Sequence, residues 1–114
     1  KSPESLLPLT PAVLHILLAL ADGERHGYAI AQEVEAMSEG QVRMGPGTLY
    51  GSILRMTSSE LVEEVVSRRR EDGDERRRYY RLTPFGKRVL VREIARLDAV
   101  VALARRKSLL QAPA

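Results

Sequence analysis

The sequence has no cysteine and no tryptophan, and its 114 residues include only one phenylalanine and two histidines. Without cysteine the chain can form no disulfide framework, no zinc site with thiolate ligands and no thiol nucleophile. It also lacks a nucleophile–base pattern and a glycine-rich phosphate loop. We therefore expect no enzyme activity, no bound metal and no cofactor.

Long hydrophobic runs are missing as well. The longest apolar run, residues 16–21, is far shorter than the ~20 residues that a membrane span requires. The first residues, Lys-Ser-Pro-Glu, lack the basic-then-apolar build of a signal peptide. With 44% hydrophobic and 29% charged residues, the composition predicts one soluble domain, a cytoplasmic location and no membrane partner.

The charge is unevenly distributed along the chain. Residues 1–65 carry four basic and nine acidic groups, a net charge of −5, whereas residues 66–114 carry fourteen basic and six acidic groups, a net charge of +8. Fifteen of the eighteen cations are arginines, which suit bidentate contact with phosphate. The asymmetry is consistent with a polyanion partner on one face, and equally with a solvated basic helix.

Proline and threonine mark the first helix. Pro3 and Pro8 predict an irregular lead-in over the first nine residues. Thr10 followed by Pro11 is typical of a helix start, and the apolar stretch after it predicts a helix that ends near Gly23.

Two further helices follow from apolar spacing. Residues 27–37 carry apolar side chains at i, i+4 and i+7 and predict the second helix. A Gly-Pro-Gly turn at residues 45–47 precedes a third, in which the same spacing is shown by Leu49, Ile53 and Met56.

The hydrophobic period changes after Glu60. Residues 61–66 predict a strand, residues 79–82 its return, and Asp72-Gly73 the hairpin turn between them. Thr83-Pro84 then predicts the start of a last helix that runs to about residue 108. This order predicts a mainly α fold with a small β-hairpin. It would form a winged helix-turn-helix over residues 10–83 and a long C-terminal dimerisation helix over 84–108, in one continuous domain.

Five segments, in this order, resemble the PadR family of transcriptional regulators. They are Leu17-Leu18-Ala19-Leu20, His26-Gly27-Tyr28-Ala29-Ile30, Gly45-Pro46-Gly47-Thr48-Leu49-Tyr50, the arginine-flanked turn Asp72-Gly73-Asp74, and Arg78-Tyr79-Tyr80-Arg81-Leu82-Thr83. The resemblance implies a homodimeric winged-helix repressor of the family's shorter branch, with a single C-terminal dimerisation helix. The chain departs from the family where a glycine usually precedes the first wing strand, because it has Ser59-Glu60 there.

The third helix is the expected DNA-reading element, because a helix fits the major groove. If its apolar stripe faces the core, its outward side presents Thr48, Gly51, Ser52 and Arg55. Gly47 would let a backbone amide approach a phosphate. Tyr50 is expected to be half-buried, either with its hydroxyl at a phosphate or as plain core packing.

The second helix and the wing complete the predicted DNA surface. A phosphate contact by Tyr28 at the start of the second helix resembles the family's use of this position, and His26 could be a helix cap or a phosphate donor. Arginines on the flanks of the wing would follow the phosphates or enter the minor groove, and pairing with the wing's own acids is compatible with this. These arginines are Arg69, Arg70, Arg76 and Arg77.

The last helix carries an apolar seam with spacings of 4, 3, 4 and 3, formed by Leu90, Ile94, Leu97, Val101 and Ala104. Such spacing predicts a coiled-coil contact of about two heptads. Leu14 and Leu17 of the first helix are expected to pack against it across the two-fold axis, although a monomer could use the same stripe as core. A dimer would place two recognition helices about 34 Å apart, so the expected partner is double-stranded DNA with an inverted-repeat operator.

Regulation and the rival functions stay open. A small-molecule effector would have to prefer one spacing of the two wings. Some relatives bind flat aromatic ligands between the dimerisation helices, but this chain has no tryptophan and no aromatic residue after Phe85. A winged helix used as a protein-interaction module would expose apolar residues on the third helix, and an RNA-binding module would expose aromatic residues.

Overall fold

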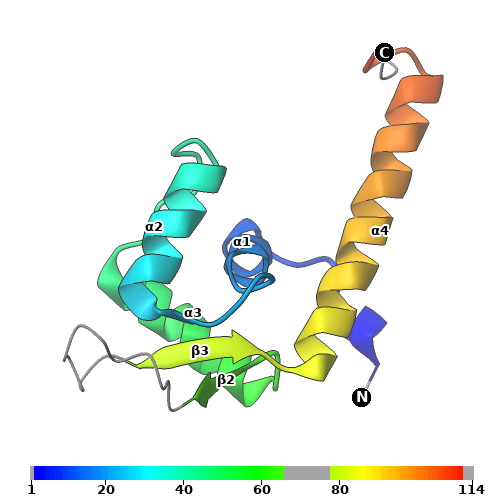
Figure 1. The fold of residues 1–114 in the computed structure, drawn as a ribbon. Helices are drawn as coiled ribbons and strands as arrows, with labels where there is room; N and C mark the ends of the chain where they lie inside the picture. Colours follow the sequence, from blue (N-terminus) through cyan, green and yellow to red (C-terminus); the bar gives the residue numbers. More distant parts are fainter. Residues whose placement is uncertain (1, 66–77, 112–114) are drawn as a thin grey trace.

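The computed structural model describes residues 2–65 and 78–111. The described chain is mainly helical with a small antiparallel sheet, as the sequence predicts (Figure 1). Its elements in order are η1 (Pro3–Leu6), α1 (Pro11–Ala19), β1 (Arg25–His26), α2 (Gly27–Met37), α3 (Pro46–Ser58), β2 (Val62–Val65), β3 (Tyr79–Leu82) and α4 (Pro84–Arg106). In this part of the chain, no helix is both long enough and apolar enough to cross a membrane.

Side-chain caps define three helix starts. The Thr10 hydroxyl accepts a hydrogen bond from the Val13 amide at 3.2 Å, and Pro11 opens α1. His26 caps α2, with Nδ1 accepting from the Ala29 amide at 3.2 Å, so of its two predicted roles the structure shows the cap. Thr83 caps α4.

The first helix is shorter than the sequence predicts. It ends at Ala19, and the Arg25 side chain reaches back so that its Nε donates to the Ala19 carbonyl oxygen at 2.8 Å. This hydrogen bond satisfies a carbonyl that the end of a helix leaves without an amide partner.

The sheet has three strands in the order β1-β3-β2, one more than the predicted hairpin. The extra strand, β1, has only two residues, and they pair with the base of the wing as Arg25↔Tyr80 and His26↔Tyr79. Two residues show no hydrophobic period, so sequence reasoning could not find this strand. Because β1 leads directly into α2, this pairing fixes the start of α2 against the sheet.

Helix α1 lies at the centre of the domain, between α2 and α4 (Figure 1). Ile16 and Leu17 are fully buried there. The prediction that Leu17 packs across a two-fold axis is therefore wrong, because its side chain is buried in the core of its own subunit and cannot contact a second one. Leu14 is only partly buried against this core.

Residues 2–9 are more ordered than predicted and are tied to α4. They include the short helix η1, and Leu6, Leu7 and Leu9 pack against the core. The carboxylate of Glu93, only 1% exposed, accepts hydrogen bonds from the Leu9 amide at 2.8 Å and from Arg96 at 2.5 and 3.1 Å. The Arg96 guanidinium, which bonds the carboxylate directly, lowers the pKa of Glu93 below its usual 4.5 although burial opposes the shift.

The turn after α3 explains how the chain manages without the glycine that the family has there. Glu60 adopts φ +63°, the left-handed conformation that glycine occupies at low cost. The Leu61 amide then donates back to the Met56 carbonyl at 2.8 Å, as in a helix ending of the Schellman type. The turn geometry is kept, with glutamate bearing the conformational cost.

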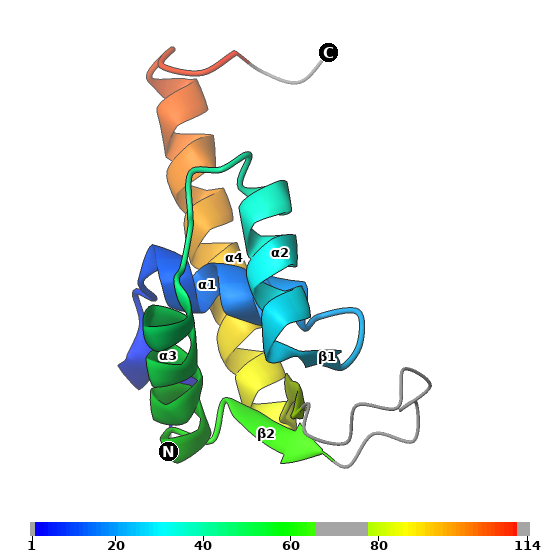
Figure 2. The same cartoon turned by 90° about the vertical axis from the view of Figure 1, so that its left-hand side faces the viewer.

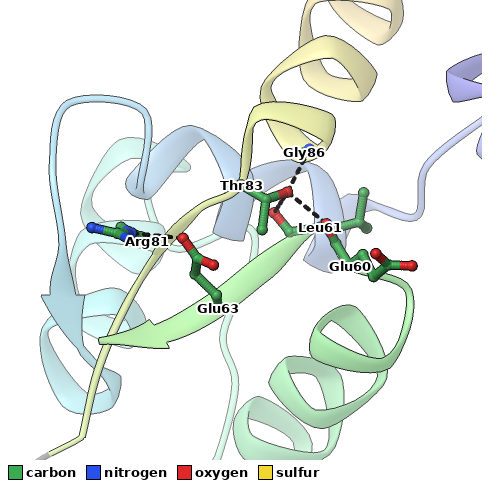
Figure 3. Close-up of polar contacts among 6 residues, drawn as sticks. All are labelled: Glu60, Leu61, Glu63, Arg81, Thr83 and Gly86. Atoms are coloured by element: carbon green, nitrogen blue, oxygen red, sulfur yellow. Dashed lines mark hydrogen bonds and ion pairs between the residues drawn. The ribbon is translucent and has the colours of Figure 1, made fainter. Parts of the chain in front are cut away.

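The same corner receives the first turn of α4 (Figure 3). The Thr83 hydroxyl accepts from the Gly86 amide at 2.8 Å and contacts the carbonyl oxygens of Glu60 and Leu61 at 2.5 and 3.2 Å. A side-chain carbon on Gly86 would lie only 2.0 Å from the Leu61 carbonyl oxygen. Gly86 is thus required by close backbone packing.

We predict that Gly86→Ala destabilises the domain, because the backbone would have to move to admit the methyl group. The free energy of unfolding, measured by urea denaturation, should fall by about 2–3 kcal/mol. Gly51→Ala is the matched control within a helix, since its added carbon would meet only Arg55, at 3.6 Å. It should gain up to about 1 kcal/mol from helix propensity. Equal effects of the two changes would contradict the steric role of Gly86.

We predict that Glu93→Gln lowers the unfolding free energy at pH 7 by about 1–2 kcal/mol, because a charged acceptor of several hydrogen bonds is lost. The lowered pKa means that folding favours the ionised carboxylate. Its contribution is therefore present above the usual pKa of 4.5 and is lost as the pH falls through the lower folded value. Urea denaturation from pH 7 to pH 3 should show the difference between wild type and variant shrinking in acid.

The control for this experiment is Glu4→Gln, which removes an exposed ion pair with Arg92 at the same junction. We expect little change at pH 7 from this substitution. A Glu93→Gln deficit that stays constant down to pH 3 would contradict the role of the ionised carboxylate.

Candidate nucleic-acid interface

Helices α2 and α3 form the helix-turn-helix unit, joined by residues 38–45. The connection is held by Ser38, whose hydroxyl accepts from the Val42 amide at 2.9 Å. Two left-handed residues, Glu39 at φ +52° and Gly40 at φ +79°, turn the chain, and Val42 and Met44 anchor it to the core. This connection fixes α3 relative to α2.

The outward face of α3 differs from the prediction at one position. Leu49, Ile53 and Met56 are buried as expected, but so is Ser52, which is 1% exposed. The prediction that Ser52 faces outward is wrong, since position 52 lies three residues after Leu49 and four before Met56 and thus on the core side. Gly47, Thr48 and Arg55 are exposed, as predicted.

Leu54, and not Ser52, lies on the outer surface of α3. Its side chain is 68% exposed, and sequence reasoning did not single it out. The signal was available, because residue 54 lies one helical turn beyond Gly51 on the outward side. The outer face of α3 is therefore less polar than predicted.

Arg55 and Gly51 share one part of this face. The Arg55 Nη2 donates to the Ser52 hydroxyl at 3.3 Å, which brings the guanidinium back over the small Gly51. Among the described residues Arg55 has no carboxylate partner, so its charge stays available to an anion.

Tyr28 and Tyr50 flank a groove of about 290 Å³ between α2 and α3. Tyr28 is 65% exposed and Tyr50 is 47% exposed, so the predicted half-burial of Tyr50 is confirmed. A side-chain carbon on Gly27 would lie 2.3 Å from the Tyr50 hydroxyl oxygen. Gly27 thus makes room for the phenol at the first turn of α2, and two phenol groups lie at the start of the helix-turn-helix unit.

The base of the wing is neutralised by its own acids. Arg81 pairs with Glu63 at 2.7 Å (Figure 3) and Arg78 with Glu64 at 3.7 Å across β2 and β3. Tyr80, which is opposite Glu64 in the strand register, is buried, and burial raises the pKa of its phenol. The four predicted wing contacts, Arg69, Arg70, Arg76 and Arg77, lie outside the described residues.

The C-terminal half of α4 extends beyond the rest of the domain in both views (Figures 1 and 2). The buried residues of α4 all lie in its first half, and they are Gly86, Val89, Leu90 at 6% exposure, and Glu93. Leu90 was predicted to lie in the dimer seam. The structure instead buries its side chain in the core of its own subunit. Beyond Glu93 the helix leaves apolar side chains in solvent, the most exposed being Ile94, Val100 and Leu103.

Leu97, Val101 and Ala104 are partly exposed on the same half of α4. No cluster of three or more potential metal ligands occurs in the described parts of the chain. The structure therefore offers two surfaces for partners. One is the helix-turn-helix face with Tyr28, Thr48 and Arg55, and the other is the apolar side of the projecting α4.

Comparisons of the sequence with known proteins show which family has this architecture. A model described as the transcriptional regulator PadR-like family matches residues 16–92. The chain is 38% identical over 85 residues to the transcriptional regulator Rv3488 of Mycobacterium tuberculosis, covering 75% of this chain and 74% of that protein. It is 40% identical over 93 residues to an uncharacterized 37.1 kDa protein in a transposon of Streptomyces fradiae, and spans 25% of that relative's length.

Solved structures agree with the sequence comparisons. A PadR family transcription regulator from Clostridium difficile superimposes with a TM-score of 0.70 at 25% identity, covering 85% of this chain and 97% of that one. A transcriptional regulator from Clostridium thermocellum shares the fold, with a TM-score of 0.67 at 20% identity over 83% of this chain and 87% of that one. The resemblance seen in the sequence motifs is thus confirmed, and the chain belongs to the PadR-like family, whose members are transcriptional regulators and not enzymes.

Proposed function

We propose that this regulator is a repressor that binds an inverted-repeat DNA operator as a homodimer, through α3 and the wing. In this proposal residues 10–83 form the DNA-binding unit and residues 84–108 the dimerisation helix. The observation that carries the proposal is the exposed outer face of α3, in a winged-helix fold whose family consists of transcriptional regulators.

The chemistry of the helix-turn-helix face supports DNA contact. Thr48 near the start of α3 can bond to base edges, and Arg55 offers a cation to guanine or phosphate. Gly47 is exposed and nothing lies within 4 Å of its missing side chain, so its amide can approach a phosphate closely. The phenols of Tyr28 and Tyr50, both beside the first turn of α2, can donate to phosphate oxygens.

Several of the described cations are paired with acidic residues of the chain itself. Arg78 and Arg81 are paired with glutamates at the base of the wing, and Arg25 contacts Asp22. In the proposal the phosphate charge is therefore met chiefly by the wing arginines at positions 69, 70, 76 and 77. Affinity that comes from such contacts is strongly salt-dependent.

The projecting part of α4 supports a homodimer. The helix of 23 residues is about 34 Å long, and its second half has no domain beneath it. An apolar helical stripe without a partner is costly in water, and a second copy of the same helix would cover it. Leu14, which is only partly buried, could add to this contact, whereas Leu17 and Leu90 could not.

A protein-interaction module is the second candidate, because Leu54 and Tyr50 leave apolar surface on α3. The ring of Tyr50 is held against the first turn of α2, however, and Thr48, Arg55 and two glycines occupy much of the remaining face. A patch of one leucine is small for a protein interface. The DNA experiment below separates the two candidates.

We predict sequence-specific DNA binding, measured by fluorescence anisotropy with a duplex from the region upstream of the protein's own gene and a shuffled duplex. The native duplex should bind more tightly, and log K should fall against log salt with a slope of about −0.9 per neutralised phosphate. Arg69→Ala and Arg77→Ala should each reduce the slope by about 0.9 without changing the preference between duplexes.

Lys107→Ala is the control for the wing variants, since it removes a cation at the far end of α4. This variant should leave both the slope and the affinity unchanged. Absence of binding to any duplex at low salt would refute DNA binding and favour the protein-interaction module.

We predict that the chain sediments as a dimer at micromolar concentration and that Val101→Glu dissociates it. A carboxylate placed on the apolar side of α4 would have to be desolvated at each contact, so we expect the dimer to weaken at least about 100-fold. Ala99→Glu, on the opposite side of the same helix, should leave the dimer intact in analytical ultracentrifugation. A monomeric wild type, or equal effects of the two variants, would contradict dimerisation through this face.

A further inference from the structure

One side chain on α3 has no structural role that its surroundings explain. Leu54 is the most exposed large apolar residue of the helix, while the core contacts of α3 are made by Leu49, Ile53 and Met56 on the other side. Leucine at a site of 68% exposure adds nothing to the packing of the subunit. Helix α3 also lies away from the projecting half of α4, whose exposed apolar residues belong to the other surface (Figure 1).

Three neighbours of Leu54 on α3 leave its side chain exposed to solvent. Gly47 and Gly51 occupy the preceding turns of the same side and have no side chains. Arg55 is bent back to the Ser52 hydroxyl at 3.3 Å, over Gly51. The two glycines let the helix come close to another surface, and Leu54, one turn beyond the half-exposed Tyr50, is then the most exposed apolar side chain on this side.

The only apolar group on a base edge in the major groove is the 5-methyl group of thymine. A helix that offers small residues around one leucine suits that group better than it suits the hydrogen-bonding edges of guanine or adenine. We propose that Leu54 is a specificity-determining residue that contacts the 5-methyl group of a thymine in each half-site. This inference rests on the proposed function, since it requires α3 to lie in the major groove.

The test begins with a duplex selected by the protein itself from a random library. Each thymine of that duplex is then replaced in turn by deoxyuridine, which keeps the pairing and the O4 acceptor and removes only the methyl group. At the contacted thymine the affinity should fall about fourfold, the value expected for one buried methyl group. Replacement in both half-sites should cost about 15-fold, and the other thymines should be nearly neutral.

The variant Leu54→Ala connects the methyl group to the side chain. It should bind the thymine duplex as weakly as the wild type binds the duplex with deoxyuridine in both half-sites. It should also bind the thymine and deoxyuridine duplexes equally well. Leu54→Met keeps an apolar side chain of similar reach and should retain most of the discrimination. Ser58→Ala, one turn further along the same exposed side, is the control and should preserve the full effect. All of these positions are exposed, so folding should be unaffected.

The outcomes separate this inference from the proposed function. Loss of the methyl effect in Leu54→Ala, with its retention in Ser58→Ala, supports the inference. Specific binding in which no deoxyuridine replacement matters, or in which Leu54→Ala shows the same penalties as the wild type, overturns the role of Leu54 and leaves DNA binding intact. If no sequence is enriched and no duplex binds, the proposed function itself fails.

Discussion

The backbone of Leu61 is the point on which the arrangement of the functional elements depends. Its amide closes the end of α3 by donating to Met56, and its carbonyl oxygen accepts from the Thr83 amide at 3.1 Å. The same oxygen lies against Gly86 in the first turn of α4. The end of α3 and the start of α4 are thus joined through one residue, with the wing strands β2 and β3 between them in the sequence.

This junction has a consequence for a dimeric regulator. If two copies meet through α4, the distance between their two α3 helices depends on the angle between the axes of α3 and α4 within each copy. The contacts at Leu61 hold that angle. The Val62↔Leu82 pairing of β2 with β3 begins at the same place, so the wing cannot change its register without disturbing the corner. The Glu93 carboxylate adds a second fixed point, because it joins the N-terminal segment to α4 where the helix leaves the core.

Much of this fold could be predicted because residues close together in the sequence, such as helix caps and prolines, determine where its helices begin. Threonine followed by proline marks two helix starts, and both threonines act as caps in the structure. Non-local features were out of reach. The strand β1 forms only because β3 lies beside it, and the burial of Glu93 depends on Leu9, 84 residues away in the chain. Such contacts leave no trace in a periodic pattern.

One site residue was misplaced and another was missed for a different reason, because the spacing contained the answer. Ser52 was predicted to lie opposite the apolar stripe, but it lies on the same helical side as Leu49 and Met56. Leu54 was not among the predicted site residues, yet it points outward. At both positions the geometry of the helix outweighs the polarity of the side chain, and departures of this kind are expected where function competes with folding.

In the proposed complex with DNA, affinity and sequence discrimination come from different elements. The cations at the base of the wing are paired with glutamates, whereas α3 carries glycines, one threonine, one leucine and one arginine on its outer side. Contacts of wing arginines with phosphates would weaken with salt, because counterions are released on binding. An apolar contact of Leu54 with a methyl group releases none. In such an arrangement, rising salt lowers the affinity for all sequences together and changes the ratio between sequences much less, because most of the charged contacts belong to the wing and the apolar contact belongs to α3.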